Sequence, residues 1–470
     1  MYLAIGDQTI LASALPAIVG SFGEAERISW IMAAYLVANT IASPVYGYIG
    51  DVFGRRKLMF VALAVYIVAG IFCALAQNVW WLIIGRLVQG LGGGGLMSLS
   101  QALVGEAVPP RERGNFQGYL AGIGMAATAI GPLVGGYVTE HLGWRYVFLF
   151  NVPIALAAVA MTFRLTAKPG TRRPDWHFDF QGLLLFVVFI LPVMYGLEQA
   201  QRISMSKLPL IAALFALAGF VLFVLIRHER KIDSPLLPIG LLRRKVIWQS
   251  NLMVFCQGAM LTSVITFLPL YVRVVRDAPA TVMGWLLLPM MVGLSSGSII
   301  AGRIVTHTGR TMILPSLALI PGSALLVYFA IATPHLSINQ MSWILGLTAL
   351  MLGSVMSVVQ VTVQIAAGPK MLGAAAASIQ FSRSVGAAFG TALFATVLFA
   401  TLSIQDVEAA RFFAELLDTG PAALATIDPA RREAINGVIA TAFQAGFLIS
   451  AAFTCVTMVL AWVNPQRRLA

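Results

Sequence analysis

The chain has 470 residues, of which 59% are hydrophobic and 11% are charged, and its mean hydropathy is +0.85. A soluble protein carries roughly 25% charged residues and has no interior large enough for so much apolar surface, so the composition excludes a soluble enzyme, a disordered chain and a β-barrel of alternating polar and apolar residues. The net charge is +12, and the basic residues lie in short segments between apolar blocks. This distribution is typical of the loops of a membrane protein rather than of a nucleic-acid-binding surface.

Apolar blocks along the chain predict fourteen transmembrane helices. A spanning helix needs about 20 apolar residues and satisfies its backbone polar groups internally. The first block lacks a basic segment and a cleavage site, so it is not a secretory signal; whether the natural chain begins upstream of Met1 stays open. The predicted spans are residues 1–20, 29–50, 57–77, 79–104, 114–138, 144–165, 180–199, 208–227, 247–272, 279–302, 312–332, 340–366, 373–402 and 436–463.

The basic residues predict the orientation of these spans. Clusters at Arg55–Lys57, Arg243–Lys245 and Arg467–Arg468 fall on the same side of the membrane as both termini. The positive-inside rule places this side in the cytoplasm, so we expect a multi-pass protein of the inner (cytoplasmic) membrane. Residues 403–435 carry several acids and a proline and are expected to form a small outer segment rather than a domain.

A weak internal repeat indicates two halves. Gly47, Gly54 and Arg55 align at one offset with Gly302, Gly309 and Arg310, and each copy follows the second helix of a six-helix block. Two such halves with substrate bound between them form a known transporter architecture. We therefore predict an all-α membrane protein with a six-helix bundle at 1–165, two linker helices and a cytoplasmic loop at 166–245, and a second six-helix bundle at 246–470.

Five motifs extend this interpretation. The segment Gly47-x-x-x-Asp51-x-x-Gly54-Arg55-Arg56-Lys57 resembles the loop signature of the major facilitator superfamily. Four other segments resemble motifs of its fourteen-span drug:proton antiporters: Gly6-Asp7-Gln8-Thr9-Ile10 running on to Ala14-Leu15-Pro16, Arg86-Leu87-Val88-Gln89-Gly90, Gly131-Pro132-x-x-Gly135-Gly136, and Pro235-Leu236-Leu237-Pro238.

The resemblance implies the major facilitator fold and proton-coupled export of hydrophobic or amphipathic drug-like compounds by alternating access. No cofactor and no metal are expected, because the sequence contains no G-K-[ST], H-E-x-x-H or C-x-x-C motif and its three cysteines have no metal-ligand spacing. The chain departs from the family pattern at Ala127, where glycine is usual, and at Thr306, where an acid is familiar. The tenth span carries no acid, which argues against transport of dications.

Asp7 and Arg86 are the candidate proton-coupling residues. A carboxylate inside a span is costly and usually faces a cavity or a partner, and a buried guanidinium needs an anion, for which Asp7 is the obvious candidate. If Arg86 and a proton compete for Asp7, protonation is coupled to helix position. A purely structural ion pair is the alternative interpretation.

The loop after the second span contains the candidate gating residues. Asp51 is expected to cap the positive N-terminus of a helix of the other half, and the resemblance indicates the helix that starts near Gly373. Glu106 is a candidate partner for Arg55. Alternatively, the basic residues serve only to keep the loop inside. The candidate gate comprises Gly47, Asp51, Gly54, Arg55, Arg56 and Glu106.

Two glycine-rich segments have structural explanations. Gly131, Pro132, Gly135 and Gly136 are expected to thin and bend the fifth helix, either as a leak-proof hinge at the interface of the halves or as ordinary helix packing. The run Gly90–Gly95 matches a dinucleotide fingerprint, but it lies inside an apolar span with no preceding strand. It is interpreted as a close-packing surface.

Polar and aromatic side chains inside the spans are candidates for the substrate cavity, although such residues also make helix–helix hydrogen bonds. Arg383 either acts in the second half as Arg86 does in the first or extends to the cytoplasmic surface. The candidate cavity residues are Tyr35, Asn39, Gln89, Gln257, Gln360 and Arg383.

Other functions remain as alternatives. One is a dedicated exporter of an endogenous metabolite, lipid or siderophore, and two buried arginines against one buried acid leave an anionic substrate open. A non-transporting membrane sensor is disfavoured because no soluble effector domain is visible. No catalytic constellation is visible either, so an enzyme is not expected. Expected partners are a small hydrophobic substrate, protons and the lipid bilayer, with no nucleic acid; a periplasmic adaptor is undecided.

Overall fold

The computed structural model describes residues 1–23, 27–165, 170, 177–201, 208–232, 235–278, 280–419 and 429–468. Within these residues the fold is all-helical, with one isolated bridge between Arg310 and Arg468. Thirteen of the described helices are long and apolar enough to cross a membrane, and the 26-residue α2 packs against α4 and α14 as a fourteenth. The predicted fourteen-helix fold is confirmed, with boundaries that differ by a few residues.

The helices fall into an N-terminal half, a linker pair and a C-terminal half. The N-terminal half contains α1 (Tyr2–Phe22), α2 (Ile28–Phe53), α3 (Arg55–Ala74), α4 (Val79–Ala107), α5 (Arg113–His141) and α6 (Arg145–Phe163). The linker contains α7 (Phe180–Gln201), α8 (Leu208–Glu229) and the short α9 (Ile239–Leu242). The C-terminal half contains α10 (Lys245–Val275), α11 (Ala280–Thr308), α12 (Ile313–Ala332), α13 (Ile338–Ala367), the 3-10 turn η3 (Pro369–Met371), α14 (Leu372–Gln405), α15 (Val407–Thr419) and α16 (Pro429–Val463).

Local sequence signals account for several helix ends. The side chain of Asn78 accepts a hydrogen bond from the backbone N–H of Trp81 at the start of α4, and Ser337 forms a capping box with Gln340 at the start of α13. These side chains satisfy N–H groups that have no partner inside the helix. Gly54 separates α2 from α3 with φ of 99°, a conformation that L side chains rarely adopt.

The glycine run of α4 is a close-packing surface, as predicted. A Cβ on Gly90 would lie 2.5 Å from the carbonyl oxygen of Tyr35 on α2, and one on Gly92 would lie 2.9 Å from the carbonyl oxygen of Ala62 on α3. The absence of side chains at these positions therefore lets α4 pack closely against two neighbours at once.

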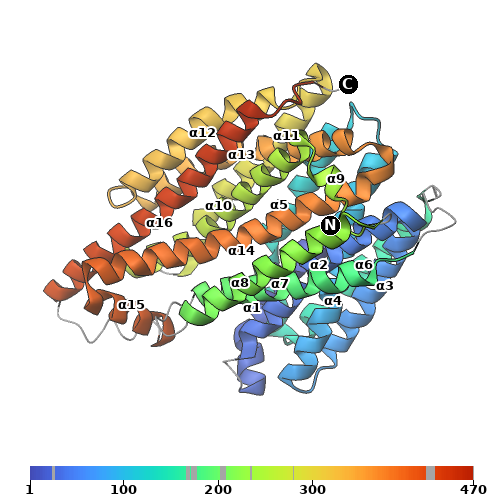
Figure 1. Cartoon of the computed structure of the whole chain (residues 1–470). Helices are drawn as coiled ribbons and strands as arrows, with labels where there is room; N and C mark the ends of the chain where they lie inside the picture. Colours follow the sequence, from blue (N-terminus) through green and yellow to red (C-terminus); the bar gives the residue numbers. More distant parts are fainter. Residues whose placement is uncertain are drawn as a thin grey trace.

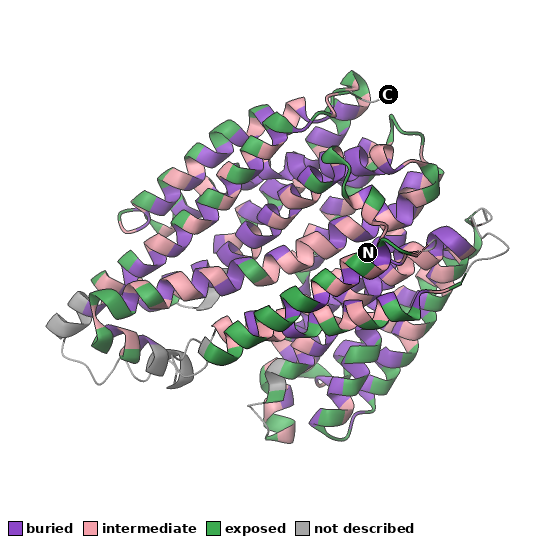
Figure 2. Cartoon of the chain, in the orientation of Figure 1, coloured by how far each residue is buried: buried purple, intermediate pink, exposed green. Residues whose placement is uncertain are grey.

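The two halves form separate bundles, and the linker helices α7 and α8 run alongside α14 at the junction between them (Figure 1). α7 contacts α2 of the first half and α14 of the second, and the rings of Phe186 on α7 and Phe381 on α14 pack in a tilted arrangement at 5.5 Å between centroids. Figure 2 shows the buried residues along the inner faces of the helices. Large apolar side chains such as Leu133 and Trp285 are exposed on the outside, where lipid surrounds a membrane protein.

The molecule has two distinct ends. We call the end with the α2–α3 turn and the α13–α14 turn the latch face; α15 lies at the opposite face, far from the C-terminus (Figure 1). The expected outer segment 403–435 contains α15, which buries Phe413 against Phe443 of α16; residues 420–428 of that segment lie outside the described residues. The same holds for 166–169, 171–176, 202–207 and 233–234 of the linker region.

Candidate transport site

Asp51 joins the two halves at the latch face. Its carboxylate accepts hydrogen bonds from the backbone N–H groups of Gly373 (2.9 Å) and Ala374 (3.0 Å), at the N-terminus of α14. The positive end of the helix dipole favours a carboxylate at this place. Arg55 holds the carboxylate from the other side and also forms an ion pair with Glu106. The structure thus brings together Asp51, Arg55 and Glu106 of the candidate gate at the N-terminus of α14, a cluster that we call the latch.

Glycines let the halves meet at this face. A Cβ on Gly47 of α2 would lie 2.5 Å from the carbonyl oxygen of Gly373, and one on Gly114 of α5 would lie 2.5 Å from that of Gly302 on α11. A further link joins α13 to α4, where Gln364 Nε2 donates to the Gln101 carbonyl at 2.9 Å. The structure is therefore closed between the halves at the latch face.

The repeated copy of the motif makes a weaker contact. Thr306 occupies the place of the expected acid, and its hydroxyl donates to the Gly302 carbonyl of its own helix at 2.9 Å. A neutral hydroxyl bonded within α11 does not cap α5 as Asp51 caps α14. Of these two related contacts, only the one at Asp51 joins the halves through a charged side chain.

Replacing Asp51 with Asn is expected to open the latch face. The variant loses the charge that faces Arg55 and the α14 dipole, a loss of about 1–3 kcal/mol for the closed arrangement. Spin labels at Lys57→Cys and Lys370→Cys, which are exposed positions on the two halves, are expected to show a larger population at long distance. Arg56 was among the predicted gating residues, but in the structure its side chain donates to the Thr162 and Phe163 carbonyls of its own half. Arg56→Gln is therefore the control. Unchanged distances in the Asp51 variant would contradict the latch.

A second charged cluster is buried inside the N-terminal half. Asp7 of α1 forms an ion pair with Arg86 of α4, and the two side chains are 1% and 0% exposed. The other Asp7 oxygen accepts from Gln89 Nε2 (3.1 Å) and from Asn151 Nδ2 on α6 (3.0 Å). The Tyr35 ring lies 4.2 Å from the Arg86 guanidinium, within the range of a cation–π contact. One carboxylate therefore ties α1 to both α4 and α6.

The glycine motif of α5 packs within the same half. A Cβ on Gly131 would collide with Thr9, and one on Gly135 with Ile10 and Ser13, all on α1. The expectation that this motif lies at the interface of the halves is therefore wrong for Gly131 and Gly135. The α5 positions at that interface are Gly114 and Gly118, and Gly118 is about three and a half turns from Gly131, on the other side of the helix.

Pro132 and Gly136, the other two residues of the motif, do not provide close packing against α1. Pro132 is exposed, and a Cβ on Gly136 would meet nothing within 4 Å. Pro132 acts on the shape of α5, because proline removes one backbone hydrogen bond from the helix.

A cavity of about 530 Å³ lies between the halves, a volume typical of sites for drug-sized ligands. α1 lines it with Ala4, Ile5 and Gln8, so Asp7 points away from it. Six methionines from five helices line its wall: Met97, Met125, Met194, Met290, Met291 and Met356. Of the predicted cavity residues, Asn39, Gln257 and Arg383 line it.

The other predicted cavity residues lie elsewhere. Tyr35 and Gln89 do not line the cavity, because both belong to the Asp7–Arg86 cluster. Gln360 lines a smaller void that shares Met356 and Arg383 with the cavity. The methionines and Asn151 were not among the predicted site residues, since neither type of residue stands out within an apolar span.

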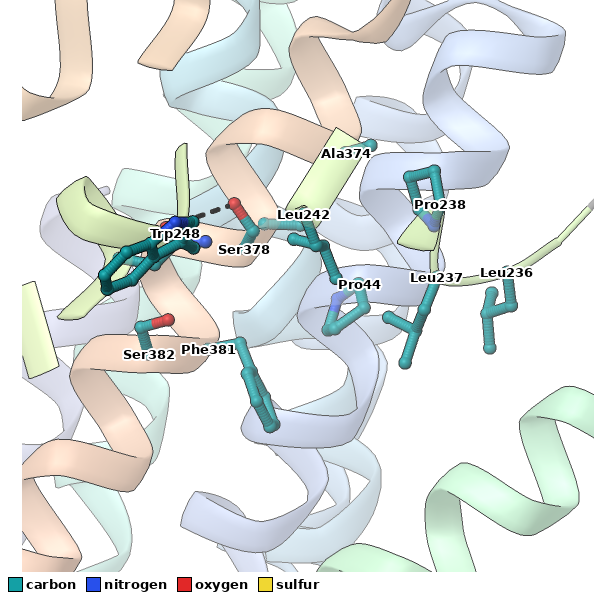
Figure 3. Close-up of a pocket in the computed structure, with 12 residues that line it drawn as sticks. Pro44, Leu236, Leu237, Pro238, Leu242, Trp248, Ala374, Ser378, Phe381 and Ser382 are labelled. Carbon is teal, nitrogen blue, oxygen red and sulfur yellow. Dashed lines mark hydrogen bonds between the residues drawn. The ribbon is translucent and has the colours of Figure 1, made fainter. Parts of the chain in front are cut away.

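A second pocket of about 240 Å³ lies beside the latch (Figure 3). The predicted linker motif supplies Leu236, Leu237 and Pro238 to it, and α14 supplies Phe381. Ser378 donates to Asn251 Oδ1 at 3.4 Å across its wall. This pocket is smaller and more apolar than the central cavity.

Comparison with known proteins agrees with this arrangement. The sequence profile of the Major Facilitator Superfamily matches residues 2–391. The chain belongs to the major facilitator superfamily. A superfamily relative, the multidrug transporter protein MdtP of Bacillus subtilis, is 30% identical over 402 residues, which are 85% of this chain and 73% of MdtP. The uncharacterized MFS-type transporter Rv1877 of Mycobacterium tuberculosis is 33% identical over 404 residues, 83% of this chain and 57% of the relative.

A solved major facilitator structure has the same fold. The human organic anion transporter MFSD10 superposes with a TM-score of 0.66 over 98% of this chain and 96% of that chain, at 14% identity. At this identity the likeness shows the fold alone. As a superfamily member with a multidrug transporter among its relatives, the chain is a multi-pass membrane transporter for small substrates and not an enzyme.

Proposed function

We propose that the chain is a proton-coupled antiporter that exports amphipathic drug-like compounds across the cytoplasmic membrane by alternating access. The observation that carries this proposal is the methionine-lined cavity between two halves that are latched together at one end. The latch face is the cytoplasmic side, in keeping with the basic residues that flank it. The structure then corresponds to the state that is closed to the cytoplasm.

The wall of the cavity suits varied substrates. Methionine is unbranched and polarizable, so it adapts its shape to different apolar surfaces. Amide side chains at Gln8, Asn39 and Gln257 add polar contacts at separate points of the wall. Such a surface supports binding of several amphipathic compounds rather than one fixed shape.

α1 connects the proton site with the substrate site. Asp7 faces Arg86 inside the N-terminal half, while the adjacent Gln8 faces the cavity. A proton on Asp7 removes the charge that ties α1 to α4 and α6, so α1 is free to shift. Substrate bound in the cavity would contact the same helix through Ala4, Ile5 and Gln8. Binding of either ligand therefore biases the equilibrium between the two conformations.

Inside-out vesicles test the proposal. A respiration-driven pH gradient is formed, and lipophilic cations, neutral compounds and organic anions are added in turn. Vesicles that contain the chain are expected to lose part of the gradient on adding a substrate, whereas vesicles without it keep the gradient. If folded protein responds to no compound of the panel, proton-coupled export of drug-like compounds is wrong, and a dedicated metabolite exporter becomes the better hypothesis.

A further inference from the structure

Arg383 is the single ionisable side chain among the described residues that line the central cavity. Among the described residues no hydrogen bond or ion pair engages its side chain, in contrast to Arg86, which is paired with Asp7. No aspartate or glutamate lines the cavity in the described part of the chain. An unpaired guanidinium inside a membrane protein is costly, so the cavity has a positive charge that lacks its counterion.

Two buried amides behind Arg383 also lack partners. Gln117 of α5 and Gln360 of α13 line the small void that Arg383 shares with the cavity, and they are 4% and 2% exposed. Within the described part of the chain, Gln117 Nε2 and both polar atoms of Gln360 have no hydrogen-bond partner. The same is true of Oε1 of Gln101, which also lines this void. A buried polar group without a hydrogen bond costs free energy. Here several such groups lie together beside an unpaired cation.

The position of Arg383 excludes a surface role. It lies about 16 Å along α14 from the start of that helix at Leu372, at 1.5 Å per residue, and it lines the cavity rather than extending to the membrane surface. Arg383 therefore faces the space that a substrate would occupy.

We propose that Arg383, supported by Gln117 and Gln360, forms an anion-binding end of the cavity that selects amphipathic compounds with an acidic head group. The carboxylate or sulfonate pairs with the guanidinium, whose planar set of donors matches these anions. The apolar body lies along the methionines. This inference rests on the proposed function for the statement that the bound compound is the transported one.

Three probes with one apolar body test the proposal: 1-pyrenebutyrate, the neutral 1-pyrenebutanol, and the pyrenebutyl trimethylammonium ion. Binding of each to the full chain in lipid nanodiscs is measured by pyrene fluorescence. The wild-type protein is expected to bind the carboxylate about tenfold or more tightly than either of the others, the size of effect that a charge-assisted hydrogen bond gives. Equal affinities, or a preference for the ammonium probe, would overturn the proposal without any variant.

Variants then locate the preference. Arg383→Gln is expected to weaken carboxylate binding about tenfold to hundredfold and to leave pyrenebutanol binding unchanged, which also shows that the variant is folded. Arg383→Lys is expected to retain part of the preference. Arg303→Gln removes the same charge from an exposed position of α11 and is expected to change nothing. Should Arg383→Gln not fold, Gln117→Leu and Gln360→Leu are expected to weaken binding of the carboxylate alone.

The binding experiment and the vesicle experiment can contradict the anion site and the proton antiport independently of each other. A carboxylate preference without substrate-dependent proton movement would retain the anion site and overturn the antiport. Proton movement driven by cations or neutral compounds, together with no carboxylate preference, would retain the antiport and overturn the anion site.

Discussion

Replacing Asp7 with Asn is expected to abolish substrate-dependent proton movement and to leave substrate binding in place. The amide has the shape of the carboxylate, and its oxygen still accepts from Gln89 and Asn151, but it binds no proton at working pH. Asp7 does not line the cavity, and the adjacent Gln8 does, so the substrate site keeps its residues. In inside-out vesicles, substrates are then expected to leave the pH gradient as stable as in vesicles without the chain.

Two controls separate loss of coupling from loss of structure. Substrate binding by the purified Asp7→Asn variant shows that the fold and the cavity are intact. Asp7→Glu keeps a titratable group at the same place and is expected to retain part of the proton movement. If substrate still dissipates the gradient in Asp7→Asn, then Asp7 is not the coupling residue. Arg86 and Arg383 would then be the next residues to test for an indirect role.

Replacing Arg86 with Met is expected to give the largest loss of stability. It leaves the Asp7 carboxylate 1% exposed and without its counterion, and breaking a buried ion pair in this way costs about 3–5 kcal/mol. Adding Asp7→Asn to Arg86→Met removes the carboxylate charge that would otherwise be buried without a counterion. The double variant is therefore expected to be more stable than the sum of the single effects predicts, by about 1–3 kcal/mol.

Unfolding of the detergent-solubilised chain measures this coupling. The four proteins of the cycle are wild type, Asp7→Asn, Arg86→Met and the double variant. A matched cycle with Arg56→Met in place of Arg86→Met serves as the control. Arg56 hydrogen-bonds to the Thr162 and Phe163 carbonyls and shares no partner with Asp7, so its effect is expected to add to that of Asp7→Asn. Additive effects of Asp7 and Arg86 would contradict a stabilising pair.

Together the two experiments distinguish the interpretations that the sequence left open for Asp7. A structural ion pair predicts strong coupling in the stability cycle and proton movement that persists in Asp7→Asn. A coupling role predicts that proton movement is lost while binding remains. Both experiments concern one carboxylate that holds three helices, so a role in both stability and coupling is physically consistent.

The sequence alone determined the membrane fold and the number of helices. Long apolar blocks leave no other way to satisfy backbone groups in lipid, so helix positions were predictable within a few residues. The Asp51 latch was also predictable, because Asp51 and Arg55 lie in one short loop, Glu106 offered a charge partner for Arg55, and the family resemblance indicated the helix that starts near Gly373. The pair of Asp7 and Arg86 followed from charge balance, since each buried charge needs the other.

The tertiary structure decided which face of each helix meets which neighbour. Gly131 and Gly135 face α1 rather than the other half, and Tyr35 and Gln89 serve the Asp7 cluster rather than the cavity. In lipid both sides of a helix are apolar, so hydrophobic periodicity does not identify the buried face. The methionine-lined cavity and the unpaired Arg383 arise from nine helices meeting in space. That arrangement depends on packing between segments that are distant in the sequence, so it cannot be predicted from the residues of a single span.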